Sequence, residues 1–178
     1  MACGVQKKWP TLKAEGYRIV AIDQHTQKVA TEQKPDWFPV NSRPRLPVSG
    51  AREKVNMLGA VTDDRERFVA LTSNRFNAEI AKHFLRAIQH EFGKKLAIVL
   101  DNASYFIAKT LKKQAAADGL LLEFLPAHSP EMNPLENCWR QLREGRANHL
   151  FRTLDDVNEY LSMALPALNS PQIYEYLC

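Results

Sequence analysis

The chain has 178 residues, of which 45% are hydrophobic and 25% are charged. This composition excludes collagen-like, low-complexity and wholly disordered chains, and the length suits one domain with a core of its own. Lysine and arginine outnumber aspartate and glutamate by 24 to 20, and the resulting charge of +4 permits a polyanionic partner without identifying one.

The positions of the cysteines and of the apolar residues indicate in which cellular compartment the protein is located. Cys3, Cys138 and Cys178 are too far apart for a disulfide framework or a CxxC metal site. No stretch approaches the roughly 18 apolar residues of a membrane span, and the first residues lack the apolar segment of a secretory signal. We therefore expect a cytoplasmic protein with no membrane partner.

The N-terminal half predicts mainly strands. Residues 1–15 are polar and basic and are expected to form a lead-in segment outside the core. Residues 17–23 are rich in β-formers and predict a strand that ends at Asp23. Residues 24–54 contain several prolines and predict irregular structure, with at most a short edge strand at 37–40. Residues 55–62 and 67–73 flank the turn formers Asp63 and Asp64 and predict a hairpin.

Helical periodicity begins after Asn77, which is placed to cap a helix that stops at Gly93. The apolar positions of this helix are Ile80, Phe84, Ile88 and Phe92. The apolar run 96–101 predicts a buried central strand that ends at Asp101. A second helix is marked by Ile107, Leu111 and Ala115 and ends near Gly119. A strand at 121–126, closed by Pro126, follows it.

Two further helices are predicted in the C-terminal part. The first has Asn133 as its cap and Pro134 at its first position, with an apolar face made by Leu135, Trp139 and Leu142. The second begins at Thr153 and ends at Pro166. The order of strands and helices predicts an α/β fold in which a mixed sheet is flanked by helices.

Three acids are placed to form a site. Asp23 and Asp101 each end a predicted strand, and ligand sites in α/β sheets form at the carboxyl ends of strands. Glu136 lies in the first turn of a helix after the last strand. Oxygen ligands without His or Cys suit Mg²⁺ or Mn²⁺ rather than zinc. Taken singly, the aspartates are also explained as turn formers, and Glu136 as an ion-pair partner of Arg140.

The segments around these acids resemble a known family. AIDQHTQ, LDNAS and LPAHSPEMNPLENCWRQLR are similar to the three acidic blocks of DDE transposases in the Tc-mariner superfamily, particularly the insertion-sequence family numbered 630. The resemblance runs from about Tyr17 to Leu165, and 34 residues separate Asp101 from Glu136. It implies a ribonuclease H-like catalytic domain at 16–168, between the lead-in 1–15 and a C-terminal tail at 169–178. It also implies that Asp23, Asp101 and Glu136 are catalytic and bind two Mg²⁺ or Mn²⁺ ions.

The resemblance further implies a function. The chain is expected to be the core of a metal-dependent DNA transposase that cleaves element ends and joins the 3′-hydroxyl to target DNA, working as a homodimer in a DNA complex. Family members usually carry N-terminal helix-turn-helix domains, which the lead-in cannot encode, so a separately encoded helix-turn-helix subunit is a further expected partner. The alternatives are another ribonuclease H-like nuclease and an inactive, DNA-binding transposase remnant.

Other residues near the acids have both functional and structural interpretations. Asn102 is expected either to orient Asp101 or a phosphate or to be a turn residue after the strand, and Asn133 to support the site chiefly as a helix cap. Gln24 stands where the family usually has Glu, and His128 where it often has Tyr. His25 is expected to be a solvated loop residue, with contact to DNA or metal as the alternative. Cys138 and Trp139 are expected in the core.

Two basic sets follow the acids along the chain. They are expected to contact DNA phosphates or else to form solvated basic helix faces. The first set is Lys109, Lys112 and Lys113 after Asp101, and the second is Arg140, Arg143 and Arg146 after Glu136.

Overall fold

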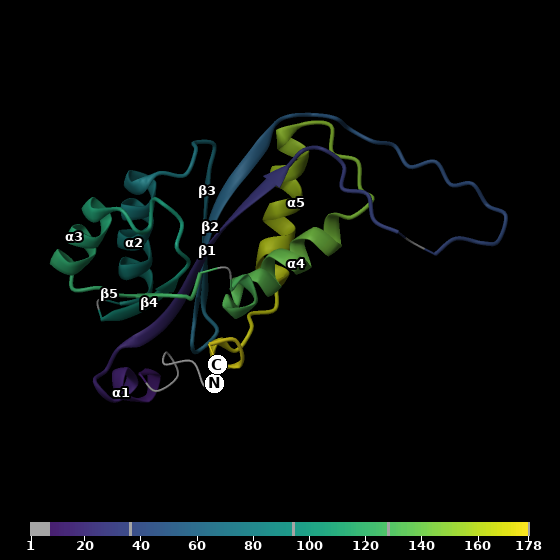
Figure 1. Cartoon of the computed structure of the whole chain (residues 1–178). Coiled ribbons are helices and arrows are strands. Elements are labelled where there is room, and N and C mark those ends of the chain that lie inside the picture. The colour runs from purple at the N-terminus through teal and green to yellow at the C-terminus, as the bar shows by residue number, and fades with distance from the viewer. Residues whose placement is uncertain (1–7, 36, 94, 128, 178) are drawn as a thin grey trace.

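The computed structural model describes residues 8–35, 37–93, 95–127 and 129–177, which form a five-stranded sheet with helices on both faces (Figure 1). The sheet order is β3-β2-β1-β4-β5. In chain order the elements are α1 (Trp9–Ala14), β1 (Arg18–Lys28), β2 (Lys54–Thr62), β3 (Arg67–Thr72), α2 (Ala78–Phe92), β4 (Leu96–Leu100), α3 (Lys109–Ala117), β5 (Leu121–Phe124), η1 (Pro130–Met132), α4 (Leu135–Arg146), α5 (Leu154–Ala167) and η2 (Ile173–Glu175). The predicted mixed sheet flanked by helices is confirmed.

Strand β1 lies at the centre of the sheet and is longer than predicted. It pairs antiparallel with β2 as far as Lys28 and parallel with β4 only as far as Ala21. The prediction that the strand ends at Asp23 is wrong, because β2 provides a partner along the whole of the extra length. Asp23 nevertheless lies just beyond the point where the parallel pairing with β4 stops.

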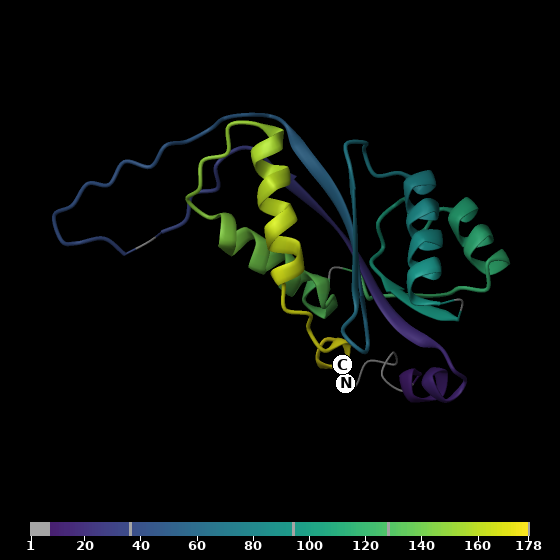
Figure 2. The ribbon, with the colours of Figure 1, turned by 180° about the vertical axis from the view of Figure 1, so that it is seen from behind.

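The two faces of the sheet bury separate apolar cores. Because successive strand residues point to opposite faces, Ile19 and Ala21 of β1 join the core under α4 and α5. Val20 and Ile22 join the core under α2 and α3. Figures 1 and 2 show the two helix pairs on opposite sides of the sheet. No helix in the described ranges has the length and apolar character that a bilayer crossing requires.

Helix ends follow the sequence signals closely. The Asn77 side chain accepts a hydrogen bond from the Ile80 N–H at 2.9 Å, and Gly93 ends α2 at a φ of 102°. Thr153 forms a capping box with Asp156, as its position at the start of α5 allows. Pro166 lies inside α5 rather than ending it, and the helix ends one residue later.

One predicted helix starts later than its apolar pattern suggests. Ile107, assigned to the apolar face, precedes α3 and is 44% exposed, so that assignment is wrong. Leu111 and Ala115 are buried as predicted. The face of α3 that packs on α2 and β5 therefore begins one turn beyond Ile107.

The segments flanking the expected domain pack onto it. Trp9 is only 3% exposed and belongs to the core beside α4 and α5, so the prediction that the lead-in stays outside the core is wrong at this residue. Ile173 and Leu177 from the C-terminal tail join the same core. Residues 1–7 and Cys178 lie outside the described residues.

The described residues between β1 and β2, 29–35 and 37–53, form a long excursion whose start packs on the body, where Val29 is buried, and whose middle projects from it (Figures 1 and 2). Its described residues contain no strand, and Trp37 and Val40 are 98% and 91% exposed. The short edge strand considered at 37–40 is therefore absent from the described part of this segment. Prolines at 35, 39, 44 and 47 account for the lack of regular pairing.

Candidate functional site

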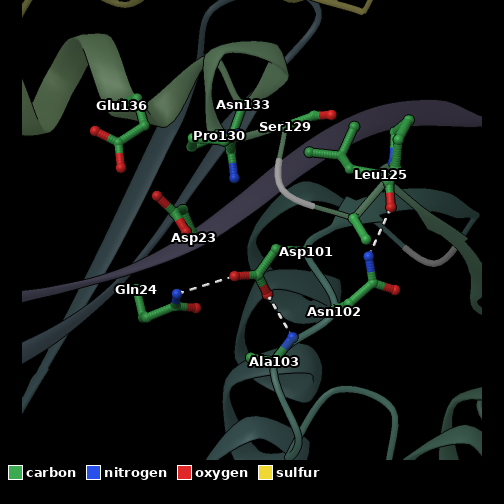
Figure 3. A pocket seen from close by; sticks show the side chains of 12 residues that line it. Asp23, Gln24, Asp101, Asn102, Ala103, Leu125, Ser129, Pro130, Asn133 and Glu136 are labelled. Atoms are coloured by element: carbon green, nitrogen blue, oxygen red, sulfur yellow. Dashed lines mark hydrogen bonds between the residues drawn. The ribbon is translucent and has the colours of Figure 1, made fainter.

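A cavity of about 450 Å³ opens where the parallel pairing of β1 with β4 ends. Five residues predicted to belong to a site line it, namely Asp23, Asp101, Asn102, Asn133 and Glu136, and Gln24 lines it as well. They come from β1, from the loop after β4 and from the start of α4 (Figure 3). The structure thus brings all three candidate acids and both candidate supporting asparagines to one pocket.

Asp23 is the most buried of the three acids, with 5% of its surface exposed. Its Oδ2 accepts a hydrogen bond from the Trp139 indole Nε1 at 2.9 Å. Burial, followed by the charge of Glu136 and more weakly that of Asp101, raises the pKa of Asp23 from 3.8 to about 7, although the Trp139 hydrogen bond opposes this. A buried carboxyl with acidic neighbours favours a nearby cation.

Trp139 is buried as predicted, but its hydrogen bond to Asp23 is not evident from the sequence. Gly59 of β2 makes room for the indole, because a Cβ at that position would lie 2.6 Å from Trp139 Cη2. His25 stacks on the same ring with centroids 5.2 Å apart. The prediction of a solvated loop histidine is wrong, because β1 continues past this residue, and burial lowers the pKa of His25 to about 4.

Asp101 directly follows β4 and is held from two sides. Its Oδ2 accepts from Gln24 Nε2 at 3.1 Å, and its Oδ1 accepts from the Ala103 N–H at 3.0 Å (Figure 3). Asn102 donates from Nδ2 to the Leu125 carbonyl at 2.7 Å and so ties this loop to the end of β5. Asp101 and Asn102 therefore have the turn roles that the sequence offered as their alternative, and both also line the pocket.

Glu136 and Asn133 are placed by the start of α4. Asn133 donates from Nδ2 to the Ile22 carbonyl at 3.1 Å and accepts from the Leu135 N–H at 3.2 Å, so its side chain joins the first residue of α4 to β1 although Pro134, and not Asn133, is at the N-cap. Pro134 precedes the helix by one residue instead of opening it. Glu136 pairs weakly with Arg143 at 3.4 Å. The expected partner Arg140 instead donates to the Asn137 side chain at 3.3 Å.

Comparisons with known proteins identify the family. Residues 18–158 match the DDE superfamily endonucleases, which is most of the chain. The chain belongs to the DDE superfamily endonucleases. An uncharacterized protein of Sinorhizobium fredii, y4pE/y4sA, is 36% identical over 66 residues, which are 36% of this chain and 47% of that protein.

Solved structures establish the fold of this DDE endonuclease. The Mos1 transposase paired-end complex matches with a TM-score of 0.72 and 14% identity, over 97% of this chain and 56% of that one. The Mos1 catalytic domain with raltegravir and Mn matches with a TM-score of 0.65 and 15% identity, over 97% and 83%. The predicted ribonuclease H-like fold is confirmed. The chain spans about half the length of the S. fredii protein and of the Mos1 chain in the paired-end complex.

None of the basic residues singled out from the sequence lines the pocket that holds the three acids. Arg146 is 3% exposed and donates to the Lys28 and Ala30 carbonyls, so it does not belong to a solvated basic face. Lys109 and Lys113 are exposed on α3, and Lys112 places its ammonium 4.7 Å from the centroid of the Phe124 ring. Arg143 lines an adjoining cavity of about 400 Å³ together with His25. Among these residues, Arg143 has the direct contact with an acid of the pocket.

The donor set of the pocket fits a hard divalent cation. The acids offer only oxygen ligands, and burial, followed by the charge of Glu136, raises the pKa of Asp23, so a bound cation would offset the cost of ionising it. Within the described ranges, no three His, Cys, Asp or Glu side chains are arranged closely enough to hold a metal ion by themselves. Each carboxylate is instead bonded to a protein donor: Trp139, Gln24 or Arg143. His128, noted from the sequence, lies outside the described residues.

Proposed function

We propose that this chain is the catalytic core of a metal-dependent DNA transposase of the Tc-mariner superfamily, in the insertion-sequence family numbered 630. Residues 16–168 form its catalytic domain, and the enzyme cleaves element ends and joins the 3′-hydroxyl to target DNA. One observation carries the proposal: Asp23, Asp101 and Glu136, from three distant segments of a DDE superfamily endonuclease, line one pocket.

In this proposal the three acids hold two Mg²⁺ or Mn²⁺ ions. When bound, the ions activate the attacking water or 3′-hydroxyl and stabilise the leaving oxygen of the phosphodiester. Trp139 orients Asp23, while Ala103 and Gln24 orient Asp101. Asn102 and Asn133 act as supporting residues, because they fix the loop and the helix that carry Asp101 and Glu136. The Mos1 structures that contain Mg and Mn support this choice of ions.

DNA is the proposed partner. Phosphate contacts from basic side chains give affinity that depends on salt and not on sequence. We assign this role to Lys109, Lys112, Lys113, Arg140 and Arg143. A Mos1 structure with the left transposon end supports a DNA partner. A separately encoded helix-turn-helix subunit is a further proposed partner. A homodimer on DNA and a cytoplasmic location complete the proposal.

The test is nicking of supercoiled plasmid by the full chain in Mg²⁺ or Mn²⁺, beside Asp101→Asn. The exposed acid Asp155 of α5 supplies a matched control, Asp155→Asn. We expect nicking that requires metal, is lost in Asp101→Asn and persists in the control, with DNA affinity unchanged in all three.

Other outcomes would identify the alternatives. Metal-dependent nicking with no joining of 3′-hydroxyl ends to target DNA, even with the helix-turn-helix subunit present, would indicate another ribonuclease H-like nuclease. A folded parent that binds DNA but never nicks it would indicate an inactive remnant. Equal nicking by the parent and Asp101→Asn would refute the assignment of the acids.

A further inference from the structure

Gln24 connects two segments of the pocket that are 77 residues apart in the chain. It follows Asp23 on β1, and because neighbouring strand residues point to opposite faces, the two side chains approach the pocket from different sides of the sheet. The Gln24 amide Nε2 lies 3.1 Å from Asp101 Oδ2, and Gln24 lines the same cavity as the three acids (Figure 3).

The chemistry of the pair fixes which end of the amide faces Asp101. An ionised carboxylate only accepts hydrogen bonds, so the amide nitrogen must point toward it. The other end of the amide, Oε1, is buried and has no hydrogen-bond partner among the described residues. A buried acceptor without a partner is costly, so packing alone does not favour glutamine at this position. The bond to Asp101 is the contact that explains it.

The neutral charge of Gln24 matters as much as its donor. A glutamate here, the residue usual in the family that the chain resembles, would place a fourth carboxylate within hydrogen-bonding distance of Asp101. Like charges at that distance repel each other strongly in a partly buried site. With glutamine, the pocket keeps three acids and Asp101 gains a donor in place of a repelling neighbour.

We propose that Gln24 is a positioning residue for Asp101, whose amide holds that carboxylate toward the pocket and whose neutrality limits the site to three acids. The proposal rests on the proposed function, because it assigns Gln24 a role in presenting Asp101 to a divalent cation. Groups that orient metal ligands typically contribute about 10- to 100-fold to metal affinity or activity.

The experiment measures Mn²⁺ binding to the full chain from the electron paramagnetic resonance signal of free Mn²⁺, together with unfolding temperatures with and without Mn²⁺ at pH 8. The variants are Gln24→Leu, which removes the donor, and Gln24→Glu, which keeps the shape but replaces the donor by a charge. Gln27→Leu is the control on the same strand, because Gln27 donates to the Lys28 carbonyl and lies outside the pocket that the three acids line.

We expect the two Gln24 variants to diverge. Gln24→Leu should bind Mn²⁺ about 10-fold more weakly, with a smaller rise in unfolding temperature on adding Mn²⁺. Without metal, Gln24→Glu should unfold at a lower temperature than the parent. Adding Mn²⁺ should raise its unfolding temperature by more than that of the parent, because the cation relieves the added repulsion. The control should match the parent in its Mn²⁺ affinity.

Loss of packing alone would shift both Gln24 variants in the same direction. The proposal would be overturned if Gln24→Leu bound Mn²⁺ as tightly as the parent. It would also be overturned if Mn²⁺ raised the unfolding temperature of Gln24→Glu by less than that of the parent. If Gln24→Leu fails to fold, Gln24→Glu decides alone. Should Asp101→Asn bind Mn²⁺ as well as the parent, the proposed function fails instead, so the two failures are distinguishable.

Discussion

Asp23→Asn should stabilise the metal-free protein while it abolishes cleavage. The pKa of Asp23 is raised from 3.8 to about 7 in the folded chain, chiefly by burial. A group with a raised folded pKa contributes stability that is fully present below the unfolded pKa and is lost as pH rises through the folded pKa. For Asp23, that loss occurs between about pH 4 and pH 7.

The magnitude follows from the size of the shift. Three pKa units correspond to about 4 kcal/mol of unfolding free energy that the ionised carboxyl costs at pH 8. Asparagine keeps the shape and still accepts the Trp139 hydrogen bond, but it cannot ionise. At pH 8 the free energy of unfolding of the variant should therefore be about 3–4 kcal/mol higher than that of the parent. For a chain of this length, this difference corresponds to an unfolding temperature roughly 6–16 °C higher. Near pH 4 that advantage should be gone.

Urea unfolding in EDTA at intervals from pH 4 to pH 8 would measure this difference. Groups common to both proteins cancel in the comparison, and Asp155→Asn should follow the parent at every pH. Adding Mg²⁺ should stabilise the parent more than the variant, because the ion offsets the charge that asparagine has removed. A stability difference between Asp23→Asn and the parent that stays constant from pH 4 to pH 8 would refute the reasoning.

Two further predictions concern packing and DNA binding. Gly59→Ala would bring a Cβ to 2.6 Å from Trp139 and should lower the free energy of unfolding by about 1–3 kcal/mol in urea. The control Gly50→Ala, whose Cβ would have nothing within 4 Å, should lower it far less. Equal losses of stability in the two variants would contradict the Gly59–Trp139 contact. Lys112→Ala combined with Lys113→Ala should reduce the slope of log affinity for plasmid DNA against log salt by up to about two. An unchanged slope would remove α3 from the DNA surface.

Local signals in the sequence placed most helices and strands, because caps and periodicity act over a few residues. Asn77 and Thr153 cap the helices predicted for them. The end of β1 was predicted wrongly because no local residue determines it: β2, which follows a long irregular segment, supplies the hydrogen bonds that extend it to Lys28. The same extension placed His25 on a strand and against Trp139.

The positions of the three acids were predictable to the residue, but their surroundings were not. Spacing and flanking motifs pointed to Asp23, Asp101 and Glu136, and the structure places all three around one pocket. The hydrogen bonds from Trp139 and Gln24 depend on how α4 docks and on which strands are neighbours. Both depend on the tertiary structure, which the local sequence does not determine. The sequence indicated Gln24 only as a departure from the family pattern.

The start of α4 shows why the motif around Glu136 extends beyond the acid itself. Asn133, Glu136 and Trp139 are spaced three residues apart, so they lie along one side of the helix start. Asn133 bonds to the Ile22 carbonyl and Trp139 to the adjacent Asp23, one on each side of Glu136 along the chain. These two bonds to β1 fix the position of α4 against the strand that carries Asp23. Asn133 and Trp139, which flank Glu136, therefore set the distance between Glu136 and Asp23. The whole segment 133–139 attaches the start of α4 to β1 beside the pocket.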